Sequence, residues 1–213
     1  MINTIKSNDN IILTDLEKLG MIERAEKKFG EFLTALNFDW INDTQMKDTP
    51  SRVAKMYVNE IYKGCYIAEP KIQAFNNDGK YDCIVFQGNI DVESTCAHHI
   101  IPFLGKAYVA YIPSADGKVI GLSKINRIVD FFCKRPQIQE NLTMQIHDYL
   151  NTICEGNQGV AVVIQAKHLC VKLRGIKQDS TMITNKLSGS FMDIHGAVRK
   201  EFYDNIKLLK SEI

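Results

Sequence analysis

The first part of the chain carries apolar side chains at a helical spacing. Leucine, isoleucine and phenylalanine recur three and four positions apart between Leu16 and Leu36, which is the period of one face of an α-helix. Asp48 followed by Pro50 is typical of a second helix start, because proline is tolerated in the first turn, where its missing N–H would have no intrahelical partner. The pattern predicts an N-terminal helical segment over residues 1–80.

The spacing changes after Tyr81. Runs of apolar and aromatic residues bounded by proline, glycine and polar turns predict strands at 84–86, 107–112, 119–120 and 160–164, and a polar strand at 180–187. Helical spacing returns in three places, with helices expected from an N-cap at Ser123 to about Lys134, from Gln137 to Cys154 and from His195 to Leu209. The second part, residues 81–213, is therefore expected to be an α+β domain.

Composition narrows the class of protein. The chain has 213 residues, 45% of them hydrophobic and 24% charged, which suits one globular core with a smaller appendage. The net charge of +1 gives no global field for nucleic acid, so we expect no nucleic-acid partner. No apolar run approaches the roughly 20 residues that cross a bilayer. Six cysteines without a secretory leader predict a cytoplasmic protein with free thiols.

Cysteine and histidine gather in two distant segments. Cys96, His98 and His99 lie in the first, and His168 and Cys170 lie in the second. A catalytic zinc site usually takes three protein ligands and leaves one position for water, and Cys96, His99 and Cys170 form such a set. A structural site would more often be closed by a second short Cys pair, which the sequence lacks. The alternative is that the cysteines are ordinary buried thiols.

Two histidines are left over for proton transfer. If Cys170 continues a strand, His168 lies two positions before it and shares its face. His98 needs a turn or a bulge to point the same way. Histidine titrates near neutral pH, so both suit acid and base chemistry beside a metal-activated water.

Cationic residues suggest an anion site. Lys124 and Arg127 share a face at the start of a helix, where backbone N–H groups also favour anions, and Arg174 follows Cys170 by four positions. Each could equally be an ordinary solvated side chain. Glu140 could be a surface residue at a helix start or could accept two hydrogen bonds from a guanine edge, and spacing does not choose between these.

These segments closely resemble GTP cyclohydrolase I. The resemblance runs from about residue 20 to the last helix, and the segments that carry it are 119–129 (VIGLSKINRIV), 134–140 (KRPQIQE), the Cys-x-His-His unit at 96–99, 168–175 (HLCVKLRG) and 48–56 (DTPSRVAKM). The family adopts the tunnelling fold, an antiparallel sheet backed by two helices. The resemblance implies assembly through pentameric barrels into a homodecamer, with active sites at subunit interfaces.

The resemblance also implies roles for individual residues. Zn²⁺ would be held by Cys96, His99 and Cys170, and protons would be moved by His98 and His168. The triphosphate of GTP would be bound by Ser123, Lys124, Arg127 and Arg174, with Arg52 helping from a neighbouring subunit. Glu140 would recognise guanine, and Gln139 would lie near the ribose. The implied reaction opens the imidazole ring at C8, releases formate and closes to 7,8-dihydroneopterin triphosphate.

Two positions depart from the family pattern. Ala97 stands where the family usually has Glu, and Asn141 stands where it commonly has Arg. A missing carboxylate beside His98 can change the orientation of that histidine. The alternative reading is therefore a non-catalytic or specialised GTP-binding relative. A zinc nucleobase deaminase is a weaker rival, because its His-x-Glu and Pro-Cys-x-x-Cys motifs are absent. The sequence does not choose between a folate, biopterin or deazaguanine pathway.

Overall fold

The chain folds into two compact units that meet in sequence at Glu69 and Pro70. We describe residues 4–211 in a computed structural model. The sequence pattern places the boundary at residue 80, eleven positions later. Residues 70–80 belong with the second unit because they contain strand β1 (Ala74–Asn76), which pairs with β4 (Lys118–Ile120).

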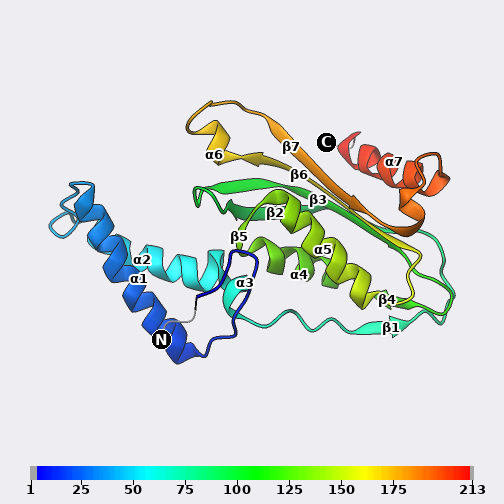
Figure 1. The fold of residues 1–213 in the computed structure, drawn as a ribbon, viewed down its shortest axis with the longest axis horizontal. Coiled ribbons are helices and arrows are strands. Elements are labelled where there is room, and N and C mark those ends of the chain that lie inside the picture. Colours follow the sequence, from blue (N-terminus) through cyan, green and yellow to red (C-terminus); the bar gives the residue numbers. More distant parts are fainter. Residues whose placement is uncertain (1–3, 212–213) are drawn as a thin grey trace. The chain divides into compact units, whose positions relative to one another are not determined.

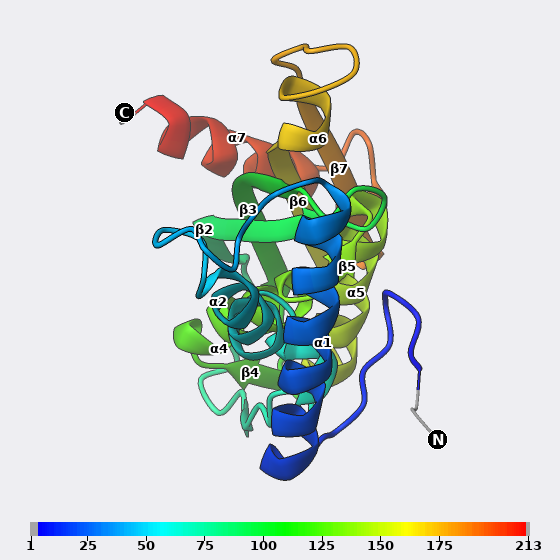
Figure 2. The same ribbon diagram turned by 90° about the vertical axis from the view of Figure 1, so that its left-hand side faces the viewer.

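The first unit is helical. Its elements are α1 (Asp15–Ala35), α2 (Thr49–Met56), a π-helical turn at Tyr57–Ile61 and α3 (Lys63–Tyr66), with α1 and α2 visible side by side in Figure 2. Thr14 and Glu17 form a reciprocal capping box that satisfies backbone N–H groups at the start of α1. Asp48 is the N-cap of α2, but its side chain makes no capping hydrogen bond.

The second unit is built on a five-stranded sheet in the order β5-β2-β3-β6-β7. The strands are β2 (Val85–Cys96), β3 (Pro102–Ile112), β5 (Pro136–Gln137), β6 (Gly159–His168) and β7 (Thr181–Leu187). All neighbours are antiparallel except β5, which runs parallel to β2. Fully buried valines and alanines at the centre of β6 explain why that strand reads as a continuous apolar run.

Helices cover both faces of the sheet (Figure 1). On one face lie α4 (Leu122–Cys133) and α5 (Gln139–Ile153), which bury Ile128, Leu142 and Ile146 in the larger core. On the other lies α7 (Ala197–Ser211), whose Phe202 and Ile206 pack in a second core with residues of β3 and β6. A short 3₁₀ turn, Gly189–Met192, leads into α7. The α+β tunnelling fold expected from the sequence is confirmed.

Four local expectations were wrong. The strand expected at 84–86 is β2, which runs from Val85 to Cys96. Gly121, rather than Ser123, is the N-cap of α4, and Ser123 lies in the first turn. The helix expected from Gln137 begins at Gln139, because Pro136 and Gln137 pair with β2. Cys170 is not in a strand. The strand β6 ends at His168, and Cys170 lies in the helical turn α6 (Leu169–Lys172).

Two strands of the sheet, β2 and β7, have edges without a strand partner among the described residues. Strand β5 pairs only with Thr95 and Cys96, so residues 85–94 of β2 have no strand partner on that side within the described part of the chain. The outer side of β7 is likewise unpaired among residues 4–211. Unpaired strand edges present backbone N–H and C=O groups that can bind another strand. Among the described helices, no stretch combines the length and apolarity that a bilayer crossing requires.

Candidate functional site

Cys96 ends strand β2 and begins a tight turn. The N–H groups of His99 and Ile100 both donate to the carbonyl of Cys96, at 3.3 and 2.8 Å, and Ile100 adopts a positive φ of 57°. The Ala97 N–H donates to the Gln137 carbonyl of β5 at 2.9 Å. The turn leaves the Cys96 side chain buried and exposes His98 and His99. It is the turn that the sequence required for His98 to face the cysteine, since His98 Nδ1 lies 3.6 Å from Cys96 Sγ.

Cys96, His168 and Cys170 form a group that is able to hold a metal. Their ligand atoms all lie within 4.8 Å of one another. Two thiols and an imidazole are the donors that zinc prefers, and zinc–sulfur bonds of about 2.3 Å fit sulfurs at such a separation. Burial and the neighbouring Cys96 thiol raise the pKa of Cys170, while the Arg174 guanidinium lowers it. A bound cation would favour both thiolates.

His99, the third ligand expected from the sequence, lies outside this group. Its Nε2 accepts a hydrogen bond from Nη1 of Arg174 at 2.7 Å. Because arginine is always a donor, Nε2 of His99 is the acceptor in this contact. Arg174 also lies close enough to Cys170 to act on its pKa, and the sequence predicts that this residue binds phosphate.

His168 is held in place by a stacked phenylalanine ring and by a contact with a glutamine amide. Phe103 of β3 is its register partner across the sheet, and the two rings stack with centroids 4.6 Å apart and planes within 10°. Nε2 of His168 lies 2.9 Å from Oε1 of Gln139. Burial lowers the pKa of His168, and the nearby carboxylate of Glu140 opposes that shift. The imidazole is therefore biased toward its neutral form.

Glu140 and Gln139 open helix α5 with opposite environments. Glu140 is exposed, close enough to His168 to act on its pKa, and stands in the first turn, where a carboxylate is favoured by the helix dipole. Gln139 is only 1% exposed. An exposed carboxylate beside the metal group is available to a ligand, whereas the Gln139 amide is enclosed by protein.

The expected phosphate ligands of α4 lie far from the metal group of the same chain. Asn126, between Lys124 and Arg127, accepts a hydrogen bond from Gln87 at 2.6 Å. Gln87 precedes Cys96 by nine positions on β2. At about 3.3 Å per residue, these two positions are separated by roughly 25–30 Å. Ser123, Lys124 and Arg127 therefore lie on the end of α4 that contacts a part of β2 remote from the metal group of the same chain.

Arg52 belongs to the first unit. It is exposed, and its Nη2 lies 3.4 Å from Oδ2 of Asp48 in a helical ion pair. Lys124 and Arg127, in contrast, have no ion-pair partner among the described residues.

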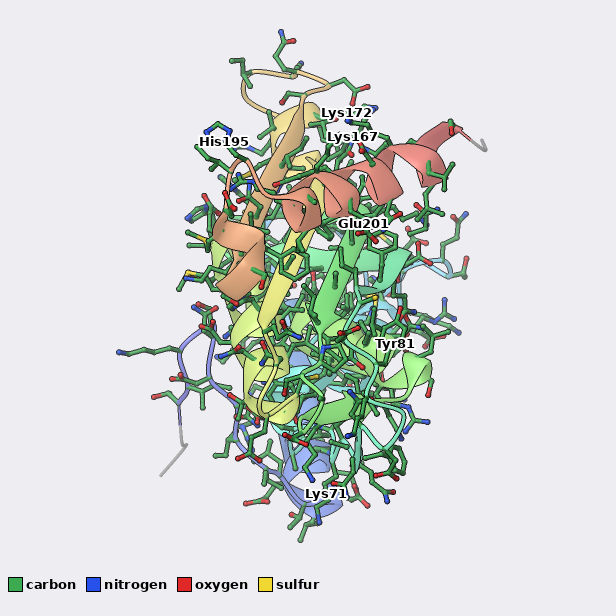
Figure 3. The ribbon with its side chains drawn as sticks, turned by 90° about the vertical axis from the view of Figure 1, so that its right-hand side faces the viewer. Lys71, Tyr81, Lys167, Lys172, His195 and Glu201 are labelled. Atoms are coloured by element: carbon green, nitrogen blue, oxygen red, sulfur yellow. The ribbon has the colours of Figure 1, made fainter. Side chains whose placement is uncertain are left out.

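The loop that carries Arg174 is held by ion pairs of the Asp179 carboxylate. Asp179 lies 3.1 Å from the ammonium of Lys167 and 3.3 Å from that of Lys172. Figure 3 labels both lysines near α6. These two hydrogen bonds hold the pKa of Asp179 below its ordinary value of 3.8. The ends of the segment between Lys172 and Asp179 are thus fastened together beside the metal group.

Sequence reasoning missed Phe103, which stacks on His168, and two threonines that contact Gln139, namely Thr143 and Thr184. Phe103 carried a usable signal, because strand pairing could place an aromatic residue opposite the histidine. Thr143 and Thr184 carried none, since isolated threonines on a helix and a strand are ordinary. Their contact depends on how α5 packs across β7.

The fold and this group define the class of the protein: a tunnelling-fold protein with a Cys–His–Cys group able to bind a metal. The family model for GTP cyclohydrolase I matches residues 25–207. The chain belongs to this family. It is 48% identical over 202 residues to GTP cyclohydrolase 1 of Flavobacterium johnsoniae, covering 94% of this chain and 86% of that protein.

Two further GTP cyclohydrolase 1 proteins are similar to most of the chain. The chain is 44% identical over 186 residues to GTP cyclohydrolase 1 of Aliivibrio fischeri, covering 87% of this chain and 84% of the relative. It is 47% identical over 183 residues to GTP cyclohydrolase 1 of Wigglesworthia glossinidia brevipalpis, covering 85% and 82%. The likeness therefore spans both units of the chain.

Proposed function

We propose that the protein hydrolyses GTP at C8, releases formate and closes the product to 7,8-dihydroneopterin triphosphate. The observation that carries this proposal is the convergence of Cys96, Cys170 and His168 in a chain of the GTP cyclohydrolase I family. Zn²⁺ is the proposed cofactor, and when bound it supplies a Lewis acid that lowers the pKa of a ligated water. The reduced thiols that such a site needs suit the cytoplasm.

The proposed metal ligands are Cys96, His99 and Cys170. The two thiols are already adjacent, and His99 follows Cys96 by three positions on the same turn. For His99 to ligate through Nε2, its hydrogen bond to Arg174 must open. Arg174 would then be free to bind phosphate, so metal and substrate sites are linked through one contact. His168 is the alternative third donor.

The remaining residues act on the substrate and its protons. His98 lies beside Cys96, and His168 is biased toward the neutral form that accepts a proton. Glu140 recognises the guanine edge, because an exposed carboxylate can accept two parallel hydrogen bonds from N1–H and the exocyclic amine. Ser123, Lys124, Arg127 and Arg174 bind the triphosphate, and Arg52 assists. Gln139 supports the reacting centre from α5.

The complete site needs more than one copy of the chain. Helix α4 contacts β2 at Gln87, roughly 25–30 Å along the strand from Cys96, which supports a site shared between subunits. The open edges of β2 and β7 supply the surface for ring assembly, because unpaired backbone groups bind another strand. We propose that the active form is a homo-oligomer, a decamer of two pentamers.

Incubation with GTP tests the activity. We expect formate release and a pterin whose oxidised form fluoresces, with GTP used at least tenfold better than guanosine, because each charge-assisted phosphate bond contributes roughly 1.5–3 kcal/mol. Cys170→Ala should remove both zinc and turnover. Cys133→Ala is the matched control, since this thiol is buried, with its pKa raised to about 12 by burial, and is unsuited to metal binding.

A protein that binds GTP tightly without releasing formate would instead support the non-catalytic reading. The observation that favours this second function is Ala97, which stands at a position where the family usually has a carboxylate.

A further inference from the structure

The amide of Gln139 has a fixed orientation. Its Nε2 lies 3.1 Å from the carbonyl of Ile164, 3.2 Å from the carbonyl of Met182 and 3.1 Å from the hydroxyl of Thr184. Backbone carbonyls only accept, so the group facing them must be the NH₂. A flipped amide would place its oxygen against two carbonyl oxygens in a buried site, which is strongly unfavourable. Oε1 therefore faces His168.

Two threonines close a ring of hydrogen bonds around this amide. The hydroxyl of Thr143 donates to the backbone carbonyl of Gln139 at 2.8 Å. This bond uses the one hydroxyl proton of Thr143. In the 2.6 Å contact between the hydroxyls of Thr143 and Thr184, Thr184 must therefore be the donor. Thr184 can in turn only accept from Nε2 of Gln139, whose two protons are shared among this hydroxyl and the carbonyls of Ile164 and Met182. Each donor in the ring has one direction, and the amide is locked.

The locked amide dictates the proton position on His168. Oε1 of Gln139 is an acceptor, so the 2.9 Å contact requires a proton on Nε2 of His168. The lone pair of the neutral ring then lies on Nδ1. Stacking on Phe103 fixes the plane of the ring, so the direction of that lone pair is also fixed.

From this geometry we infer that Gln139 is a positioning residue, which acts through His168 rather than on the ribose. Together with Thr143 and Thr184 it holds His168 as the Nε2–H tautomer and presents Nδ1 to the reacting centre. Its 1% exposure and the use of both ends of its amide leave no polar group for a substrate. The inference rests on the proposed function for its kinetic consequence, but the tautomer is a property of the protein alone.

The tautomer is measurable without turnover. We would label the full-length protein with ¹⁵N-histidine and record ring-nitrogen spectra, assigning His168 by its loss in His168→Gln. Wild type should carry the proton on Nε2. Gln139→Leu, which keeps the size of the side chain but removes the acceptor, should give a mixture of tautomers. Phe103→Leu is the control, because it removes stacking and leaves the Nε2–H bond. A wild-type proton on Nδ1, or an unchanged tautomer in Gln139→Leu, overturns the inference.

Kinetics separates positioning from ribose contact. Gln139→Leu should lower kcat for formate release by about ten- to a hundredfold, the usual effect of losing a partner that orients a catalytic histidine, with KM little changed. The loss should be equal for GTP and 2′-deoxyguanosine triphosphate. A smaller loss with the deoxy substrate would mean that Gln139 contacts the ribose hydroxyl, and would contradict our assignment.

Thr184 gives a variant that is less disruptive to folding. Thr184→Val removes the two neutral hydrogen bonds of this hydroxyl, to Gln139 and to Thr143, with little change of shape and should lower kcat roughly two- to tenfold. Thr184→Ser keeps the hydroxyl and should retain the wild-type kcat. Equal impairment of Val and Ser variants would overturn the role of the hydroxyl. If wild type releases no formate at all, the proposed function fails, and the ¹⁵N spectra still decide the tautomer.

Discussion

At the scale of single residues, the open question for metal binding is whether His99 or His168 is the third ligand beside the two thiols. The two thiols come from β2 and α6, which are distant in sequence and adjacent in space. His99 is tethered to Arg174, and His168 is tethered to Gln139. The two histidines therefore differ in what each must give up to bind a metal. His99 loses one exposed hydrogen bond, whereas His168 would use a lone pair that its surroundings already leave free.

Zinc content after single substitutions distinguishes the two histidines. We expect His99→Ala to lose most of its zinc, and His168→Ala to keep zinc while losing turnover, as measured by elemental analysis and formate release. His195→Ala changes an exposed histidine in the segment just before α7; it is the control and should retain both. The reverse pattern for the first two variants would assign the third ligand to His168.

Ala97 is the second feature at this scale. The residue is half-buried, and its N–H is bonded to Gln137, so a longer side chain can be added without breaking the turn. We expect Ala97→Glu to raise turnover by about tenfold, because a carboxylate partner orients the adjacent His98, and to leave zinc content unchanged. Ala97→Gln has similar length without the charge and serves as its control. Identical rates for all three proteins would show that His98 needs no such partner here.

At the scale of elements, the segment between Lys172 and Asp179 is organised by charge rather than by a core. Leu173 and Ile176 on this segment are 64% and 72% exposed, so little apolar burial holds it in place. What fastens it is the Asp179 carboxylate between two ammonium groups. Because the folded pKa of Asp179 is lowered, this contribution is complete above its ordinary value of 3.8 and is lost as the pH falls through the lowered value.

Asp179→Asn should therefore loosen the segment at neutral pH. We expect faster hydrogen exchange over residues 173–178 and a higher KM for GTP, because Arg174 is carried on this segment. The difference from wild type should disappear in acid, where Asp179 is protonated in both the folded and unfolded chain. Asp204→Asn is the matched control, since Asp204 bridges Lys200 and Lys207 on α7 with a pKa lowered to about 2. A changed KM in that control would indicate a general charge effect.

Periodicity predicted most elements because each buries one face. Strand β6 and helices α4, α5 and α7 follow their apolar spacing to within a few residues. Strand β2 was expected only at 84–86, because the buried positions near its end include the polar residues Ser94 and Thr95. The other errors fell where backbone geometry, not burial, decides. A helix can begin at Gly121 as readily as at Ser123, and nothing in the spacing around Cys170 distinguishes a strand end from a helical turn. The threonine ring around Gln139 was unpredictable because its partners are joined only by tertiary packing.

At the scale of the whole molecule, the proposed shared site divides each chain into two half-sites. The thiols and His168 lie at one end of β2, and the α4 cations lie toward the other. A ring of copies joined through β2 and β7 would bring each metal group against the α4 of a different subunit. The family resemblance implied shared sites, and the length of β2 supplies a physical reason for them.

Subunit mixing tests this arrangement. Cys170→Ala lacks the metal half-site and Arg127→Ala lacks the phosphate half-site, so each assembly alone should be nearly inactive. Co-expression should restore part of the wild-type rate, because some interfaces then combine two intact halves. Mixing Cys170→Ala with Cys96→Ala is the control and should restore nothing. No recovery in the first mixture, with mixed assembly verified by mass spectrometry, would place both halves on one chain.

The separation of the two half-sites along β2 has a genetic consequence. A chain altered at Arg127 would keep its own metal centre intact and disable the centre of its neighbour. In a cell carrying one normal and one altered copy of the gene, the altered product would therefore inactivate sites whose metal ligands come from normal chains. Alleles of the α4 cations should be dominant over the normal gene in proportion to their share of the assembly, whereas an allele that prevents assembly should be recessive.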